Sequence, residues 1–228
     1  MGRVSRTIQG GFTLIEMAMV MVIASMLVGA GLMLGQSLIN SMYAKELLAM
    51  ARDLSASSRF FKEKFHYLPG DLPLAGGDLQ GVLTSHCHFP THLPEQAVGV
   101  GVGNGLINKS DLAGDLASES LCVRNHLSAA GLISGGAGSE GGILSLQSRY
   151  GSVDLIANSG SGLVENHSHV RLPAHILNVI EFSDLPRAIA LEMDLALDDG
   201  RLTSGLAQAD IDPGVDSAAV VRFFAVPL

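Results

Sequence analysis

Residues 11–35 read GFTLIEMAMVMVIASMLVGAGLMLG and form the longest apolar run of the chain. From Phe12 to Gly35 the run holds 24 residues, and Glu16 is its only ionisable side chain. As a helix it would measure roughly 36 Å at about 1.5 Å per residue, which is enough to cross a hydrocarbon core of about 30 Å. The run therefore predicts a membrane-spanning helix over residues 12–35.

Charge is distributed unevenly around this run. Residues 1–65 carry seven Lys/Arg and four Asp/Glu, whereas residues 66–228 carry seven and eighteen. Arg3 and Arg6 precede the run, so the positive-inside rule places the N-terminus in the cytoplasm and the acidic part on the other side of the membrane. A cleaved secretory signal is the alternative interpretation, with residues 29–31 as the cleavage region, although its apolar core would be only about 7–15 residues long.

Glu16 stands where a membrane disfavours charge. An ionised carboxylate near the membrane centre would cost on the order of 2.5–3.5 kcal/mol, and a glutamate tolerated at the membrane edge is one explanation. The segment Gly11-Phe12-Thr13-Leu14-Ile15-Glu16 has a short basic leader before it and a long apolar helix after it. In this arrangement it resembles the cleavage motif of type IV prepilins.

The resemblance implies a defined maturation. A prepilin peptidase would cut after Gly11, remove the leader peptide 1–11 and N-methylate Phe12. Glycine suits the cut because a backbone without Cβ can approach the protease closely. In a filament, Glu16 would neutralise the N-terminal amine of Phe12 of a neighbouring subunit, while the side chains between these two residues would only pack.

The chain departs from many major pilins, which carry a helix-bending proline in the membrane half of this helix. No proline occurs between residues 12 and 65, and Gly29, Gly31 and Gly35 occupy the corresponding region. Each glycine weakens a helix by roughly 1 kcal/mol relative to alanine. Local unwinding is therefore one expectation, and close packing of helices at small residues is the other.

The sequence becomes amphipathic after Gly35 without a signal that breaks the helix. Leu47, Leu54 and Phe61 recur seven residues apart, with charged side chains between them, which is typical of a helix with one buried face. We expect one helix over residues 12–65, of which 36–65 is the amphipathic half.

A turn is predicted to end this helix at residues 67–73, because Pro69, Gly70 and Pro73 disfavour its continuation. The segment Tyr67-Leu68-Pro69-Gly70-Asp71 also resembles what many prepilin-type proteins carry after the long helix. Asp71 is expected to be a turn or cap residue rather than a ligand.

Residues 66–228 are expected to form an extracytoplasmic globular head. Short alternating segments predict antiparallel strands at 143–150, 152–157, 170–172, 177–182, 205–209 and 219–226. A helix is predicted at 115–133. A second one is predicted to start after a cap at Ser183 or Asp184, with Pro186 in its first turn, and to continue through the apolar residues 188–197. A long N-terminal helix packed on a small antiparallel sheet is the α+β class, in the arrangement of a pilin head.

Both cysteines of the chain, Cys87 and Cys122, fall in this head. In an oxidising compartment a disulfide is expected, and closing a loop of about 35 residues would stabilise the fold by roughly 3–4 kcal/mol. The alternative is a zinc site that joins Cys87 to His86, His88 and His92. Adjacent residues cannot easily direct all their side chains to one ion, and no four-ligand spacing is evident.

Aspartates gather near the C-terminus, where some secretion pseudopilins hold calcium: Asp194, Asp198, Asp199, Asp210 and Asp212. Asp198-Asp199-Gly200 offers the sharp turn that a calcium site needs, but the EF-hand spacing is missing, and a solvated helix end is the alternative. We expect no metal and no cofactor. Asp198 and Asp199 are the candidate ligands for the alternative that the chain binds calcium. No G-x-S-x-G segment or other nucleophile arrangement occurs, so we do not expect an enzyme.

These observations predict a structural subunit of a type IV pilus or related filament. The expected partners are a prepilin peptidase, other pilin or pseudopilin subunits, an inner-membrane assembly platform and the membrane itself. Nucleic acid is not expected, because binding its phosphates needs clustered basic side chains. The expected location is a single-pass inner-membrane protein with its head outside the cytoplasm, and then a pilus or pseudopilus, including the cell surface.

Two alternatives remain open for this function. A pseudopilin of a type II secretion system would share the same architecture. A membrane-anchored periplasmic binding domain would belong to a different functional class.

Overall fold

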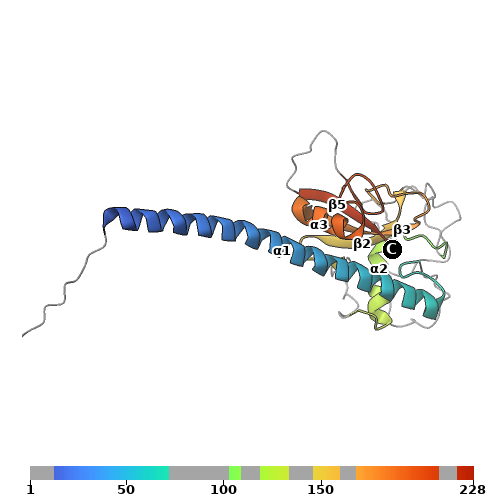
Figure 1. Cartoon of the computed structure of the whole chain (residues 1–228). Helices are drawn as coiled ribbons and strands as arrows, with labels where there is room; N and C mark the ends of the chain where they lie inside the picture. Colours follow the sequence, from blue (N-terminus) through green and yellow to red (C-terminus); the bar gives the residue numbers. More distant parts are fainter. Residues whose placement is uncertain (1–12, 72–102, 109–118, 134–145, 160–167, 211–219) are drawn as a thin grey trace, which may run out of the picture. The chain divides into compact units, whose positions relative to one another are not determined.

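The computed structural model describes residues 13–71, 103–108, 119–133, 146–159, 168–210 and 220–228 (Figure 1). Its elements are α1 (Leu14–Phe65), α2 (Glu119–Ala129), β1 (Leu146–Gln147), β2 (Ser152–Ala157), β3 (Asn178–Pro186), α3 (Arg187–Leu197), β4 (Gln208–Ala209) and β5 (Val220–Pro227). The long N-terminal helix and the small antiparallel sheet confirm the predicted α+β, pilin-like architecture. By its contacts the chain divides into two compact units, Met1–Met42 and Tyr43–Leu228, and the division falls inside α1.

Helix α1 runs unbroken from Leu14 to Phe65 and confirms the expected single helix. It remains helical through Gly29, Gly31 and Gly35, so the expectation of local unwinding at these glycines was wrong for this chain. At its C-terminal end His66 adopts a φ of 65°, and its N–H donates to the carbonyl of Lys62 at 2.8 Å. A left-handed residue in this position is a common way to end a helix.

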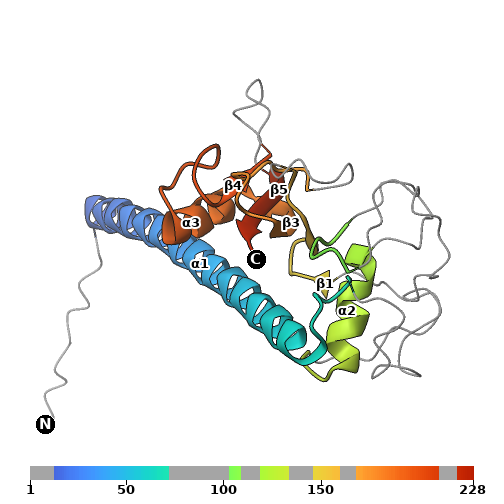
Figure 2. The same cartoon turned by 90° about the vertical axis from the view of Figure 1, so that its right-hand side faces the viewer.

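In the unit Tyr43–Leu228 one face of α1 lies in the main core. Leu47, Leu54 and Phe61 are buried, as their seven-residue spacing predicts. They belong to the same core as apolar side chains of α2, α3 and the inner face of the sheet. Figure 2 shows these elements around the C-terminal part of α1. Residues 43–65 of the helix are therefore a structural part of the head.

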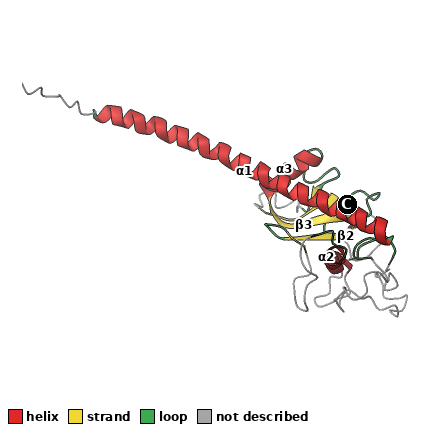
Figure 3. Cartoon of the chain, turned by 90° about the horizontal axis from the view of Figure 1, so that it is seen from below, coloured by secondary structure: helices red, strands yellow, loops and turns green. Residues whose placement is uncertain are grey.

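The sheet has the strand order β1-β2-β3-β5-β4, and every neighbouring pair is antiparallel. Figure 3 shows β2 and β3 of this sheet beside the C-terminal part of α1. Val153, Phe182 and Phe224 lie opposite one another on β2, β3 and β5, and all three belong to the main core. On the other face, Ile156 pairs with Val179 and belongs to a second, smaller core. Alternation along each strand thus supplies two apolar faces.

The predicted strand at 170–172 was wrong, because this segment is irregular. Val170 and Leu172 are buried over the outer face of the sheet, which explains their apolar alternation. Their backbone groups bind side chains instead of a neighbouring strand. The carbonyl of Val170 accepts the hydroxyls of Ser159 and Ser168, and the N–H of Leu172 donates to Asn158 Oδ1 at 3.0 Å.

The predicted start of the second head helix was also wrong. Strand β3 continues to Pro186, and α3 begins at Arg187 without a side-chain cap. Leu185 pairs with Val221 of β5 and is fully buried, which favours continuation of the strand. The hydroxyl of Ser183 is committed elsewhere, because it accepts the N–H of Ser152 at 2.8 Å.

Candidate functional site

The first turn of α1 contains both a helix cap and Glu16, the carboxylate that the sequence predicts to lie in a membrane. Thr13 precedes the helix, and its Oγ1 accepts the N–H of Glu16 at 3.3 Å. Thr13-x-x-Glu16 therefore has the spacing of a capping box, and Glu16 lies near the positive end of the helix dipole. The expectation that Thr13 only packs was wrong, although the T-x-x-E spacing was already visible in the sequence.

The apolar side chains that follow Glu16 on α1 are open to their surroundings. Every large apolar residue from Leu14 to Met42 is exposed, with Leu14 at 93% and Met33 at 77%. The next charged residue after Glu16 is Lys45. Exposed apolar surface of this extent is typical of a segment that another apolar phase or partner covers. By length and composition α1 is also able to cross a membrane.

The predicted processing site, Gly11 and Phe12, lies outside the described residues. Cleavage after Gly11, methylation of Phe12 and its pairing with Glu16 therefore stay predictions. Ideal Cβ atoms at Gly29, Gly31 and Gly35 meet nothing within 4 Å in this chain. Contacts of these glycines with neighbouring helices stay a prediction as well.

In the head, Asp71 ties the turn after α1 to a distant loop. Its carboxylate is buried and accepts the N–H groups of Gly103, Asn104 and Gly105, the last at 2.7 Å. Burial raises the pKa of Asp71, while these three N–H groups oppose the rise. Asp71 thus acts within the fold as a link between two chain segments, in line with the expected structural role.

Gly70 explains why this turn holds its shape. Its φ is +98°, and a Cβ at this position would lie 2.7 Å from the carbonyl oxygen of Glu119. Its N–H donates to Nδ1 of His126 at 2.8 Å, and the imidazole stacks on Phe61. The turn, α2 and the buried face of α1 therefore meet at one point (Figure 2).

Glu119 is a second buried carboxyl at this point, and the sequence reasoning missed it. Its Oε2 accepts the N–H of Asn108 at 2.7 Å. Burial, and to a smaller extent the nearby charge of Asp71, raise the pKa of Glu119 to about 8 against the opposing effect of the Asn108 N–H. Near neutral pH the group is therefore mostly protonated, which lowers the cost of burying it.

Of the two cysteines, the structure describes only Cys122. Cys122 is completely buried in α2, whereas Cys87 and the histidines at 86, 88 and 92 lie outside the described residues. The disulfide between Cys87 and Cys122 stays a prediction.

The aspartates at the end of α3 fold a tight loop. Asp198 accepts the N–H of Leu206, and Asp199 accepts the N–H of Arg201 at 2.9 Å and the hydroxyl of Ser204 at 2.9 Å. Burial, together with the charges of Asp199 and Asp198, raises the pKa of Asp194 to about 6. Asp210 is described and exposed, whereas Asp212 lies outside the described residues.

Within the described ranges, no group of three or more His, Cys, Asp or Glu side chains is arranged to hold a metal ion. Calcium at Asp198 and Asp199 stays a prediction.

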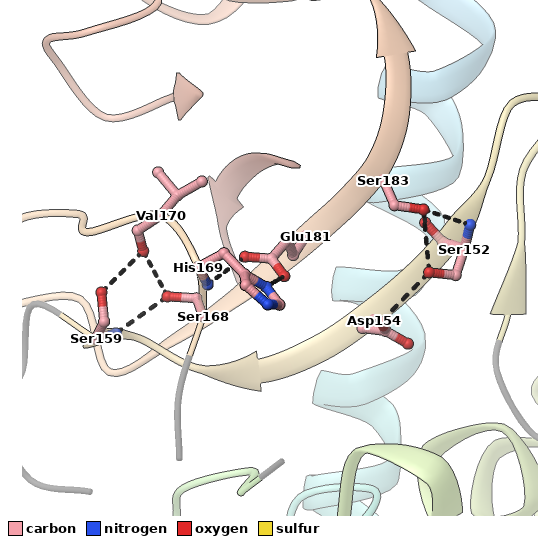
Figure 4. A network of polar contacts seen from close by, with 8 residues as sticks. All are labelled: Ser152, Asp154, Ser159, Ser168, His169, Val170, Glu181 and Ser183. Atoms are coloured by element: carbon pink, nitrogen blue, oxygen red, sulfur yellow. Dashed lines mark hydrogen bonds and ion pairs between the residues drawn. The ribbon is translucent and has the colours of Figure 1, made fainter. Parts of the chain in front are cut away.

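A polar network fastens the irregular segment over the outer face of the sheet (Figure 4). Glu181 on β3 is buried; its two oxygens contact the backbone N–H and Nδ1 of His169, each at 2.8 Å. The imidazole also stacks on Phe223 with a centroid distance of 3.6 Å. A lone glutamate inside an apolar strand was the sequence signal for this contact.

Comparison with known protein families matches residues 6–32 to the prokaryotic N-terminal methylation motif. No curated protein and no solved structure matched the chain. The matched region contains the first turn of α1 and most of its exposed apolar surface. The motif is that of structural pilin-type proteins. The methylation motif and the long apolar helix that it overlaps together fit a type IV pilin-like protein.

Proposed function

We propose that the chain is a structural subunit of a type IV pilus or related filament. A prepilin peptidase cuts the precursor after Gly11 and N-methylates Phe12, and the mature subunits assemble through α1. The observation that carries the proposal is the apolar half of α1, which is exposed on all sides and has Glu16 as its single charge. The chain acts by assembly and not as an enzyme.

The exposed apolar surface suits two successive environments. A helix that is apolar all round is stable in lipid or inside a bundle, but not in water. Before assembly, lipid covers the residues from Leu14 to Met42, with the head on the extracytoplasmic side. In the filament, the same surface of neighbouring subunits takes the place of lipid. One sequence therefore serves both states without refolding.

Glu16 sets the register between neighbouring helices in this proposal. Cutting after Gly11 creates a charged amine at Phe12, which no longer has the leader before it. A carboxylate and an amine about 4 Å apart attract by about 4 kcal/mol at an effective dielectric constant of 20. Leaving either charge alone among apolar helices would be costly, so the pair selects one stagger of the subunits.

Mass spectrometry of the protein from its own membrane tests the processing step. The expected mature chain begins at methylated Phe12. Replacing Gly11→Val should leave the precursor uncut because of the added side chain, whereas Gly10→Val serves as the matched control and should still be cut. A first residue other than methylated Phe12 in the wild-type protein would reject the processing proposal.

The assembly step is tested with Glu16→Ala. This variant should insert into the membrane and be processed, but its incorporation into filaments should drop at least about tenfold, since the amine loses its partner. Glu46→Ala is the matched control, because Glu46 is an exposed glutamate of the same helix. Equal incorporation of both variants would contradict the pairing.

Sheared surface filaments separate a pilus from a short secretion pseudopilus. If the chain is a pilus subunit, the protein should be found in sheared filaments. Immunogold should then label these filaments along their length. A pseudopilin of a type II secretion system would stay with the membrane fraction and would be needed for release of secreted proteins. A membrane-anchored binding domain would appear in neither assembly and would tolerate Glu16→Ala.

A further inference from the structure

A groove in the head lies between the amphipathic half of α1 and the chain around the end of α3 and β5. Its cavity volume is about 610 Å³, and its apolar lining includes Leu48, Ala51, Leu197, Leu206 and Val226. Figure 2 shows α3 next to α1 on this side of the head. The groove lies entirely within the unit Tyr43–Leu228.

Two arginines border the groove. Arg52 and Arg59 line it from α1 and are exposed. Their seven-residue spacing places them on one helix face about two turns apart. Neither has an ion-pair partner among the residues that the structure describes. Glu63 also lines the groove, so its border has an excess of one positive charge among these three side chains.

Helix α3 presents the complementary surface. Ile189, Ala190 and Met193 face the core, yet Leu191 and Leu195 on the outer side are 45% and 64% exposed. A helix that is apolar on both sides is typical of one that is covered on both sides. We call Leu191 and Leu195 the α3 ridge.

The ridge ends in negative charge. The last turn of α3 contains no basic residue, and the exposed Asp198 and Asp199 follow it directly. The negative end of the helix dipole lies at the same place. Arg201 is the nearest positive charge on the following loop, and it leaves the two aspartates and the helix end with a net negative charge.

We propose that the groove of one subunit receives the α3 ridge of a second copy of this chain, with Arg52 and Arg59 near the acidic end of that ridge. The inference rests on the proposed function, in which heads are held side by side. Groove and ridge are different patches, so the contact is heterologous; a heterologous contact forms an open helical array when its rotation does not close into a ring, which is the case that the proposed filament requires. Each exposed charge pair contributes little to binding by itself. In an assembly the neighbouring heads are present at a high effective concentration, so weak pairs contribute to the contact.

Disulfide trapping in the full-length chain tests the contact. Two single variants, Ser55→Cys in the groove and Leu195→Cys on the ridge, are expressed together in the native cells with different tags. Oxidation should give a cross-linked product that contains both tags, whereas each variant expressed alone should give none. Absence of the mixed product would overturn the proposal.

The charge component is tested in the Ser55→Cys chain. Adding Arg52→Gln and Arg59→Gln should lower the yield of the mixed product about fivefold. The matched control removes the same charge with Arg171→Gln and Arg222→Gln, which are exposed residues outside the groove lining. An equal loss in both double variants would overturn the role of the arginines.

Repeating the cross-linking in chains that also carry Glu16→Ala distinguishes failure of this proposal from failure of the proposed function. If the wild-type chain is in filaments and no mixed product forms, the groove contact is wrong and the filament function stands. If the chain is never in filaments but the mixed product forms in membranes of both backgrounds, the function is wrong and the head contact stands. Both fail if neither filaments nor the mixed product is found.

Discussion

Two parts of the same helix, residues 14–42 and residues 43–65 of α1, differ in what surrounds them. In residues 14–42 every large apolar side chain is exposed. In residues 43–65 some apolar side chains form a buried stripe, and others are exposed to solvent. Both parts have the same backbone geometry. The difference shows that helix periodicity alone does not tell whether a helix is completed by its own chain or by its environment.

The largest expected effect comes from breaking the buried part. Phe61 is fully buried and lies 4.5 Å from the ring of Phe65, measured between centroids. Phe61→Ala should lower the free energy of unfolding of the head by about 3–5 kcal/mol, because it leaves a cavity. Urea unfolding of the full-length chain in detergent, followed by circular dichroism, measures this change.

Leu27→Ala is the control for this change in the exposed part, since Leu27 is 70% exposed. It should alter head stability by no more than about 0.5 kcal/mol. Equal losses in the two variants would contradict the division of α1 into two environments.

A pH dependence is expected in the head, which contains the second part of α1. Because the pKa of Glu119 is raised from 4.5 to about 8, the folded state binds more protons than the unfolded state between these values. This contribution to stability is fully present below about pH 4.5 and is lost as the pH rises toward 8, by up to about 1.4 kcal/mol per pH unit. Urea unfolding at a series of pH values measures the slope.

Glu119→Gln keeps an acceptor for the N–H of Asn108 but cannot ionise, so the stability curve of the variant should be flatter over this range. Asp71 and Asp194 remain in both proteins, and the difference between the two curves isolates Glu119. Parallel curves would show that Glu119 ionises normally in the folded chain.

Glycines in the head and in the first part of α1 should respond to substitution with opposite signs. Gly70→Ala should destabilise the head by at least about 2 kcal/mol, since a positive φ and a contact with the backbone of Glu119 oppose a Cβ. Gly31→Ala adds a Cβ with nothing within 4 Å and should stabilise its helix by about 1 kcal/mol. Thermal melts of the head and hydrogen exchange along α1 measure the two changes. A loss of helix stability in Gly31→Ala would mean that α1 needs a position without a side chain at Gly31.

The smallest expected effect is at the cap of the exposed part. Thr13→Val removes the acceptor of the Glu16 N–H and should destabilise the first turn by about 1 kcal/mol. Amide exchange of Glu16 in micelles should then be about fivefold faster, while exchange in the last turn of α1 stays the same. Unchanged exchange at Glu16 would show that the cap does not hold this turn.

Sequence reasoning predicted the elements that depend on neighbours along the chain. The helix through Phe65, the strand 152–157 and the second head helix follow from periodicity and turn residues. It failed at residues 170–172, because burial over the sheet gives the same apolar alternation as a strand. It also placed the start of α3 too early, since pairing of β3 with β5 through Pro186 overrides the local cap signals at residues 183–184.

The contacts inside the head could not be predicted in this way. Gly70 meets His126 across 56 residues, and Asp71 meets Gly105 across 34. No local pattern links such positions, because their distance depends on how α1 and α2 pack.

The sequence by itself determined the N-terminal part: an apolar helix with a single carboxylate, whose first part lies inside a methylation motif. That was possible because both the helix and the motif are local, and because the length of a membrane span is set by the thickness of the bilayer. The tertiary structure decided the rest. It buried Asp71 and Glu119 against backbone N–H groups, and it placed the groove of α1 and the ridge of α3 on the same head. Such features arise when segments far apart in the chain exclude water together.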